Sequence, residues 1–314
     1  MAVSEQSTRP KRASARRDFA KDASEVVSGV TVTHPHRSWW PDDAITKGDV
    51  AHFYDRMAPH ILPWLLGRPL VAERCPEGML GTCFFQKNFA GRAPPEVPTH
   101  AVPAESTGRT VSYVVGGSPQ TLMTLVNLGC IAIHTMNCRV EALQQPDWLA
   151  FDLDPGAAGA GAFADAARAG LLLRRILEEL GVRSYPKTSG ARGLHVFVPL
   201  RPGPDQAAVR GVARRIADRM QAEDPALAAV ESLKRARKGR VYIDVQRNAF
   251  GQTIVAPYSV RRQPGAAVST PLDWDEVKPS LQPGRFNLRT IEKRVASRDP
   301  WSDFWQDRQA LPDI

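Results

Sequence analysis

The sequence lacks the features that mark membrane, secreted and zinc-binding proteins. No apolar run reaches the roughly 18 residues that cross a bilayer, and the N-terminus has no apolar signal core. The cysteines Cys75, Cys83, Cys130 and Cys138 form no CxxC pair and no short Cys/His spacing of the zinc type. We therefore expect reduced thiols, in or near the core of a soluble protein of the cytoplasm.

Acidic residues are fewer than basic ones. The chain has 33 Asp and Glu residues against 41 Lys and Arg residues, which gives a formal net charge of +8. This balance favours a polyanionic partner such as nucleic acid, although a soluble basic protein without such a partner has the same composition. With 314 residues, of which 43% are hydrophobic, the chain can bury one large core or two smaller ones.

The first 28 residues differ from the rest of the chain. They are rich in Ser, Ala and basic residues and contain almost nothing apolar, so we predict a disordered basic tail over residues 1–28. Such an arm could contact phosphates, or it could be a solvated leader without a specific role. Residues 29–314 are predicted to form one folded domain.

Hydrophobic periodicity predicts a mixture of helices and strands after the tail. The helix expected over 47–66 is interrupted by Pro59 and Pro63. The helix expected over 163–180 is followed by Gly181, a residue typical of the position after a helix. The mixture predicts an α+β, or mixed α/β, fold. The expected helices span 47–66, 163–180 and about 205–222, a loop runs into a helix over 116–126, and the expected strands span 130–140, 193–199, 241–246 and 253–257.

A further strand, WLAFDLDPG (148–156), carries two carboxylates one residue apart. Because side chains alternate along a strand, Asp152 and Asp154 share one face while Phe151 and Leu153 point into the core. Two carboxylates on one face repel each other unless cations lie between them. Oxygen ligands of this kind favour magnesium or manganese over zinc. The alternative is an exposed strand end with solvated acids.

The stretch VYIDVQRN (241–248) adds a third carboxylate. Val241, Ile243 and Val245 alternate inward, which leaves Asp244 on the opposite face. A third strand carboxylate is what a site for two divalent ions needs, since both ions must be anchored and bridged. By itself, Asp244 could equally be an ion-pair partner.

Between these two strands lies YPKTSGARGLHVFVPL (185–200). Ser189 and the glycines after it predict a tight turn whose backbone N–H groups can converge on an anion. His195 follows on a strand, with Arg192 close by in the sequence. We interpret the stretch as a phosphate-binding loop, and the alternative is a Gly-rich hairpin followed by a core histidine.

Acidic strand positions on both sides of a Ser/Gly/His loop form a known pattern. The sequence resembles the polymerase domain of bacterial DNA ligase D, a branch of the archaeo-eukaryotic primase superfamily. The resemblance covers nearly everything after about Val30 and implies a primase-like catalytic core, with central sheets flanked by helices, over residues 29–314. It rests on DLD, SGARGLH and YIDVQRN and extends through HPHRSWWP, ITKGD, FFQKN, IAIH, KRARKGRVYID, TIVAPYSVR and a closing DPW.

The resemblance implies a role for each residue that matches the family's motifs. Asp152, Asp154 and Asp244 would be the catalytic residues that hold two Mn²⁺ or Mg²⁺ ions. At Arg37 the family has a lysine, so the charge is kept while the reach of the side chain differs. The implied nucleotide-binding residues are His134, Ser189, Arg192, His195, Arg237 and Arg261, and the implied DNA-binding residues are Arg37, Lys47, Phe84, Phe85 and Lys87.

Some of these residues have simpler interpretations. His134 could be a satisfied core histidine, and Arg237 lies in a basic run, KRARKGR, that could be a solvated loop. Phe84 and Phe85 cannot both face the core of one strand, which suits stacking on bases, although they could be ordinary aromatics under a sheet edge.

The resemblance implies a template-directed nucleotidyltransferase that fills gaps or extends ends in bacterial non-homologous end joining, with a preference for ribonucleotides. Its expected ligands are DNA with a 5′-phosphate at a gap or broken end and an NTP or dNTP. Ku and a DNA ligase are its expected partners, at the nucleoid. The alternatives are a primase that starts chains without a primer and a non-catalytic module that bridges DNA ends.

The sequence contains no Asp-Gly dipeptide, and therefore no KxDG motif of a ligase nucleophile. We expect either a stand-alone polymerase or a piece of a longer chain.

Overall fold

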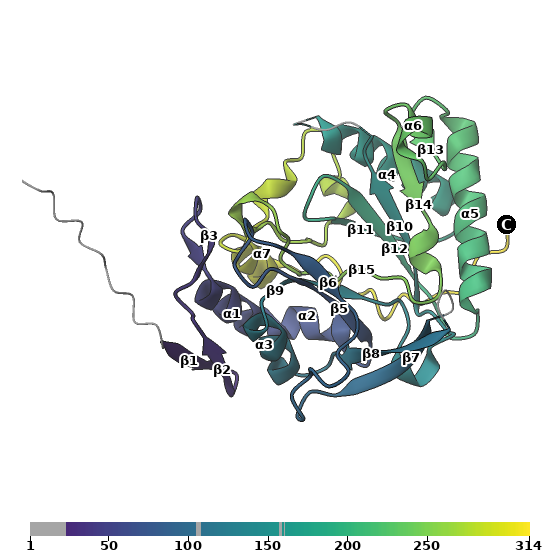
Figure 1. The fold of residues 1–314 in the computed structure, drawn as a ribbon. Coiled ribbons are helices and arrows are strands. Elements are labelled where there is room, and N and C mark those ends of the chain that lie inside the picture. Colours follow the sequence, from purple (N-terminus) through teal and green to yellow (C-terminus); the bar gives the residue numbers. More distant parts are fainter. Residues whose placement is uncertain (1–22, 105–107, 157–158, 160) are drawn as a thin grey trace, which may run out of the picture.

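Two β-sheets form the centre of the protein (Figure 1). The computed structural model describes residues 23–104, 108–156, 159 and 161–314. Sheets and helices are mixed along the chain, which confirms the predicted α+β class. Among the described residues, no helix is both long and apolar enough to pass through a membrane.

The first sheet contains both acidic strands. Helices α4 (Ala162–Glu179) and α5 (Gln206–Glu223) cover one of its faces, where Phe151 and Leu153 join the core that these helices share with the sheet. Neighbouring strands are antiparallel except for the last pair, which is parallel. In spatial order the strands are β11 (Tyr185–Thr188), β12 (Leu194–Pro199), β10 (Trp148–Asp154), β14 (Val241–Asp244) and β13 (Ala228–Ala229).

The second sheet shares a core with the open face of the first. Trp148 of β10 and Phe197 of β12 belong to the same apolar cluster as Ile131 and Ile133 of the second sheet. Its strands are β15 (Ile254–Val255), β9 (Cys130–Thr135), β5 (Pro69–Arg74), β8 (Arg109–Val115) and β7 (Thr99–Ala104), with β6 (Phe84–Gln86) paired to β5. The helices α1 (Lys47–Arg56), α2 (Ala58–Leu65) and α3 (Pro119–Asn127) contribute to this cluster.

Short elements complete the fold, and one of them corrects a predicted boundary. The predicted tail extends to residue 28, but Ser24–Val27 form strand β1, which pairs with β2 (Val30–Thr33). Residues 1–22 of that tail lie outside the described part of the chain. The other short elements are β3 (Ser38–Trp40), β4 (Ile45–Thr46), α6 (Lys234–Arg237) and α7 (Ile291–Ser297).

Several predicted elements end earlier in the structure than in the sequence pattern. The helix expected over 47–66 is divided at Met57 into α1 and α2, with Pro59 in the first turn of α2. The strand expected over 130–140 ends at Thr135, where its partner β5 begins. Strand β14 ends at Asp244 because the next residues form a 3-10 turn whose Gln246 N–H bonds to the Asp244 carboxylate.

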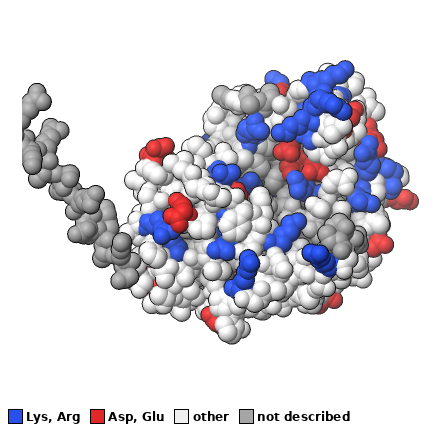
Figure 2. Space-filling model, viewed as in Figure 1, with Lys and Arg blue, Asp and Glu red and all other residues white. Residues whose placement is uncertain are grey.

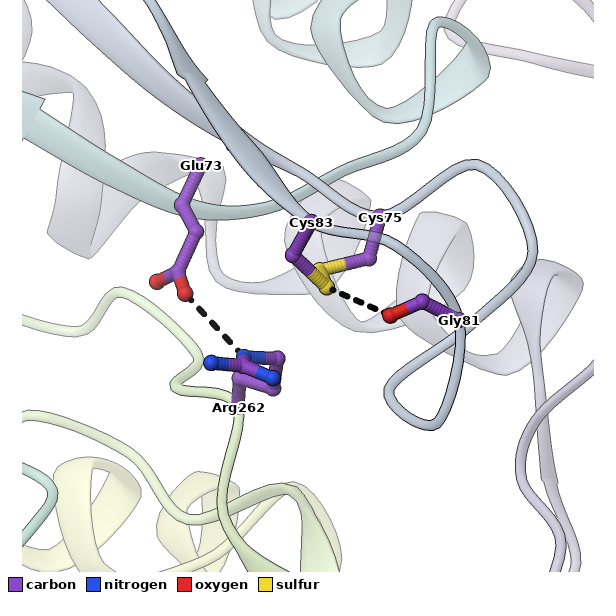
Figure 3. The surroundings of a disulfide bond; sticks show 5 residues. All are labelled: Glu73, Cys75, Gly81, Cys83 and Arg262. Carbon is purple, nitrogen blue, oxygen red and sulfur yellow. Dashed lines mark hydrogen bonds and ion pairs between the residues drawn. A yellow bond between two sulfur atoms is a disulfide. The ribbon is translucent and has the colours of Figure 1, made fainter.

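A disulfide joins Cys75 to Cys83, which corrects the prediction that all the cysteines are reduced (Figure 3). Strands β5 and β6 run antiparallel with Arg74 opposite Phe84, so the residues that follow and precede them meet, with Cα atoms 4.4 Å apart. Sequence spacing alone does not reveal this reversal of the chain. Cys130 and Cys138 are free and buried, as predicted.

Candidate active site

The three predicted acidic residues lie on two neighbouring strands. Asp152 of β10 is directly opposite Asp244 of β14, and Asp154 is opposite Tyr242. Asp152 and Asp244 are only 8% and 7% exposed. Because Phe151 packs on the other face of β10, the carboxylates face away from α4 and α5, as the alternation predicts.

Arg247 lies between Asp152 and Asp244. Its Nε is 3.3 Å from Asp152 Oδ2, and its Nη2 is 3.2 Å from Asp244 Oδ2. Within the described residues, no three His, Cys, Asp or Glu side chains are grouped as ligands of one metal ion. The guanidinium thus supplies positive charge at the position where a cation shared by these carboxylates would lie. Sequence reasoning missed this residue, which stands three positions after Asp244.

The negative charge of the three carboxylates is unequally compensated. Burial first, and then the Asp152 charge, raise the pKa of Asp154 to about 6. Burial also raises the pKa of Asp244, whereas His195 and Arg247 together overcome the effect of burial and hold the pKa of Asp152 below its ordinary value. Excess negative charge on clustered oxygen donors is what Mg²⁺ or Mn²⁺ relieves, so these residues fit such an ion.

Replacing Asp154 with Asn should stabilise the metal-free protein at neutral pH. The folded protein binds the Asp154 proton more tightly than the unfolded chain, whose carboxyl titrates near 3.8, so stability decreases as the pH rises from about 4 through about 6. A neutral Asn removes this loss. We expect the free energy of unfolding at pH 7 to rise by about 1–2 kcal/mol, after allowance for partial exposure.

Urea unfolding in the presence of a chelator, at pH 4 and at pH 7, measures this gain. It should be much smaller at pH 4, where the parent carboxyl is protonated in the folded protein and partly protonated in the unfolded chain. An equal gain at both pH values would contradict an origin in the Asp154 charge. Asp218→Asn, on the exposed side of α5, is the control and should give little change.

The loop after β11 has a different internal arrangement from the one predicted. The backbone N–H groups of Ala191 and Gly193 converge on the Ser189 hydroxyl oxygen, at 3.1 and 3.0 Å. These two donors are therefore not directed at an external anion, because the side chain that precedes them accepts both. The hydroxyl keeps its own O–H to donate, and Ser189 lines the cavity described next.

A cavity of about 490 Å³ lies beside Asp152 and Asp154, within the size range of small-molecule sites. Figure 2 shows acidic side chains in a hollow near the centre of this face, with basic side chains around them, over the region of β10 and β14. The predicted site residues that line the cavity are Phe85, Lys87, His134, Asp152, Asp154, Ser189, Arg192, His195 and Arg261.

Two buried nitrogen atoms in the cavity wall have no hydrogen-bond partner among the described residues. They are Nε2 of His134 and Nε of Arg261, although Arg261 Nη1 donates to the Ser189 carbonyl at 3.3 Å. Burial and then the Arg261 charge keep the pKa of His134 well below its ordinary value, so the ring is neutral at pH 7. Buried polar atoms are usually satisfied, so a polar ligand in the cavity would account for both.

The predicted DNA-binding phenylalanines are on the surface beside this cavity. Phe84 and Phe85 in β6 are 44% and 57% exposed, and the Phe85 ring meets the His134 ring edge-on at 5.3 Å. The Arg74 guanidinium lies 5.3 Å from the Phe84 ring centre. Both rings are therefore exposed, whereas the sequence required only one of them to face away from the core.

The structure does not bring Lys47 and Arg37 to the cavity. The Lys47 ammonium is buried and donates to the Thr33 carbonyl and to both oxygens of Asn127, at 2.7 to 2.8 Å. Burial, and then Arg37, lower the pKa of Lys47 to about 8. Arg37 itself donates to the Pro76 carbonyl and to the Glu77 carboxylate. As placed, Lys47 has all of its donors in use.

Arg237 lies next to the acidic strands and does not line the cavity. Its guanidinium stacks over the Tyr242 ring at 3.8 Å and donates to the carbonyls of Glu231 and Ser232. Its charge lowers the pKa of Asp154 in opposition to burial. The basic run that contains Arg237 is therefore partly ordered by internal contacts.

Comparisons with known proteins identify the family of this chain. The family described as "LigD, primase-polymerase domain" matches residues 46–301. The multifunctional non-homologous end joining protein LigD of Pseudomonas aeruginosa is 33% identical over 95% of this chain and 35% of its own length. The bifunctional LigD of Bacillus subtilis is 30% identical over 92% of this chain and 47% of its own length.

Among solved structures, the polymerase domain of Mycobacterium tuberculosis ligase D in complex with DNA is similar over 90% of this chain and all of that chain, with a TM-score of 0.81 and 28% identity. The present chain spans between about a third and a half of the length of the LigD relatives above. Sequence and fold therefore lead to the same assignment: the chain belongs to the LigD primase-polymerase domain family.

Proposed function

We propose that this chain is a template-directed nucleotidyltransferase that fills gaps and extends ends in non-homologous end joining. The observation that carries the proposal is one cavity lined by the Asp152 and Asp154 carboxylates, the Ser189 loop and two buried nitrogen atoms that lack partners in the described part of the chain. Carboxylates and polar donors in one cavity suit a nucleoside triphosphate with its cations. Membership of the LigD polymerase family supports the same reaction.

The proposed chemistry divides the cavity wall into two parts. On one side, Asp152 and Asp154, with Asp244 on the neighbouring strand, would hold two Mg²⁺ or Mn²⁺ ions. Such ions would supply the positive charge that a primer 3′-hydroxyl and a leaving pyrophosphate need. His134, Ser189, Arg192 and Arg261 would bind and orient the triphosphate. His195 lines the same wall, with its ring nitrogens engaged by Lys187 and Asp152. Arg guanidinium groups suit this task because their planar donors match phosphate oxygens.

The surface beside the cavity would hold the DNA. Phe84 and Phe85 offer exposed rings for stacking on template bases, with Lys87 as a phosphate contact at the cavity edge. The M. tuberculosis polymerase domain that shares this fold was solved in complex with DNA, which supports a DNA ligand here. A 5′-phosphate contact at Arg37, partners such as Ku and a DNA ligase, and a place at the nucleoid are further parts of the proposal.

A gapped duplex with a downstream 5′-phosphate tests the proposal directly. With ribo- and deoxynucleoside triphosphates in competition, we expect the primer to be extended across the gap with ribonucleotides preferred. Product gels with a labelled primer, followed by alkaline cleavage at ribonucleotides, measure both outcomes. Synthesis on bare single strands without a primer would instead indicate a primase. DNA binding without any synthesis would indicate an end-bridging module and would refute the proposal.

A further inference from the structure

A single row of side chains crosses four strands of the sheet beneath the cavity. Lys187 of β11 is opposite His195 of β12, which is opposite Asp152 of β10, which is opposite Asp244 of β14. Directly opposite residues on neighbouring strands place their side chains on the same face of the sheet. The row therefore links Lys187, at one end, to the carboxylates at the other.

Lys187 is a completely buried lysine, with 0% of its surface exposed. Its Nζ is 2.6 Å from Ser269 Oγ and 2.9 Å from His195 Nδ1. The Ser269 hydroxyl donates its own proton to the Thr188 carbonyl at 2.9 Å, so it can only accept from Lys187. A buried lysine is costly, and this one makes no ion pair of its own within 4.0 Å in the described residues.

The neighbours of His195 determine which ring nitrogen carries the proton. Its Nε2 is 3.2 Å from Asp152 Oδ1, and a carboxylate can only accept a hydrogen bond. Nε2 must therefore carry hydrogen, and Nδ1 must accept from Lys187 if the ring is neutral. The other Asp152 oxygen, Oδ2, is the one paired with Arg247.

We propose that Lys187 is a positioning residue: it holds His195 as the Nε2–H tautomer, which fixes Asp152 through Oδ1 and leaves Oδ2 directed at the cation position. The inference rests on the proposed function, because it assigns Asp152 to a metal site. Replacing a residue that orients a metal ligand through hydrogen bonds typically lowers metal affinity or activity by about 10–100-fold.

The first test uses the unmodified protein. The ¹⁵N chemical shifts of the His195 ring, assigned by comparison with a His195→Asn variant, report which nitrogen is protonated. We expect a protonated Nε2 and an unprotonated Nδ1. A protonated Nδ1 in the folded protein would overturn the proposal without any further variant.

The second test removes the donor while keeping the volume of the side chain. In Lys187→Met we expect the ¹⁵N shift of His195 Nδ1 to change because its hydrogen-bond donor is gone. We also expect Mn²⁺ binding to the protein alone to weaken by about 10–100-fold, and kcat for primer extension to fall more than KM rises. Ser269→Ala is the matched control, since it removes the other Lys187 partner but keeps the contact with Nδ1. It should keep the His195 tautomer.

The outcomes separate this inference from the proposed function. A folded Lys187→Met protein with unchanged Mn²⁺ affinity and unchanged His195 shifts would refute the positioning role. A parent protein that shows the Nε2–H tautomer and the Lys187-dependent Mn²⁺ affinity, but never extends a primer, would refute the polymerase reaction and leave the positioning role intact.

Discussion

Asp152→Asn should reduce primer extension on a gapped duplex by about 10³-fold or more. The substitution keeps the size of the side chain but removes the charge that a divalent ion would need, a loss of about 4 kcal/mol or more of transition-state stabilisation. Single-turnover extension at saturating nucleotide measures the effect. DNA affinity should be unchanged, because the Asp152 side chain is buried, whereas Phe84 and Phe85 are exposed.

A matched exchange elsewhere on the protein controls for the general effect of losing a carboxylate. Asp218 on α5 pairs with Arg214 at 2.8 Å and is half exposed, so Asp218→Asn should leave extension unchanged. Extension by a pure Asp152→Asn preparation at a rate near that of the parent would refute the assignment of Asp152 to the catalytic centre.

Gly190→Ala should both destabilise the protein and impair nucleotide binding. Gly190 has a φ of +72°, and an added Cβ would lie 2.5 Å from Arg261 Cγ and 2.8 Å from the Ser269 backbone nitrogen. The left-handed backbone costs a residue with a Cβ about 1–2 kcal/mol, and overpacking adds about 1–3 kcal/mol. Arg261 would have to move, which would weaken its contribution to the cavity. Thermal unfolding and nucleotide titration measure the two effects.

Gly211 on α5 provides the contrasting substitution. An added Cβ there meets nothing closer than an Arg215 guanidinium nitrogen at 3.6 Å. Because Ala is a better helix former than Gly, Gly211→Ala should raise stability by about 0.5–1 kcal/mol. If Gly190→Ala lowers the free energy of unfolding by no more than the small change seen in Gly211→Ala, the close approach of Gly190 to Arg261 is not needed.

The acidic face of the site was predictable because strand alternation depends on the sequence alone. Alternating apolar residues around Asp152 and Asp244 specify which side chains face the core, and the structure places both carboxylates on the opposite face, directly across from each other. The mixed fold class followed from the same periodicity. What alternation cannot supply is the order in which strands pair, which decides that β10 lies between β12 and β14.

Residues that act through distant contacts were not predictable in the same way. Arg247 matters because a 3-10 turn after β14 directs it back between two carboxylates, and nothing in a local pattern signals that turn. In the sequence, Lys187 is one more cation near the predicted phosphate-binding loop. Only the pairing of β11 with β12 shows that it lies opposite His195. The Ser189 loop was located correctly, but its internal hydrogen bonds depend on backbone geometry that the sequence does not display.

The disulfide-closed loop between β5 and β6 bears on how DNA binding is assayed. Within this loop, the Pro76 carbonyl and the Glu77 carboxylate accept hydrogen bonds from Arg37. The loop leads directly into Phe84. A thiol reductant in the assay buffer would cleave the disulfide and remove the covalent constraint on this loop. DNA affinities measured with and without reductant therefore describe two covalent forms of the protein, and each preparation needs its free-thiol content recorded beside its binding curve.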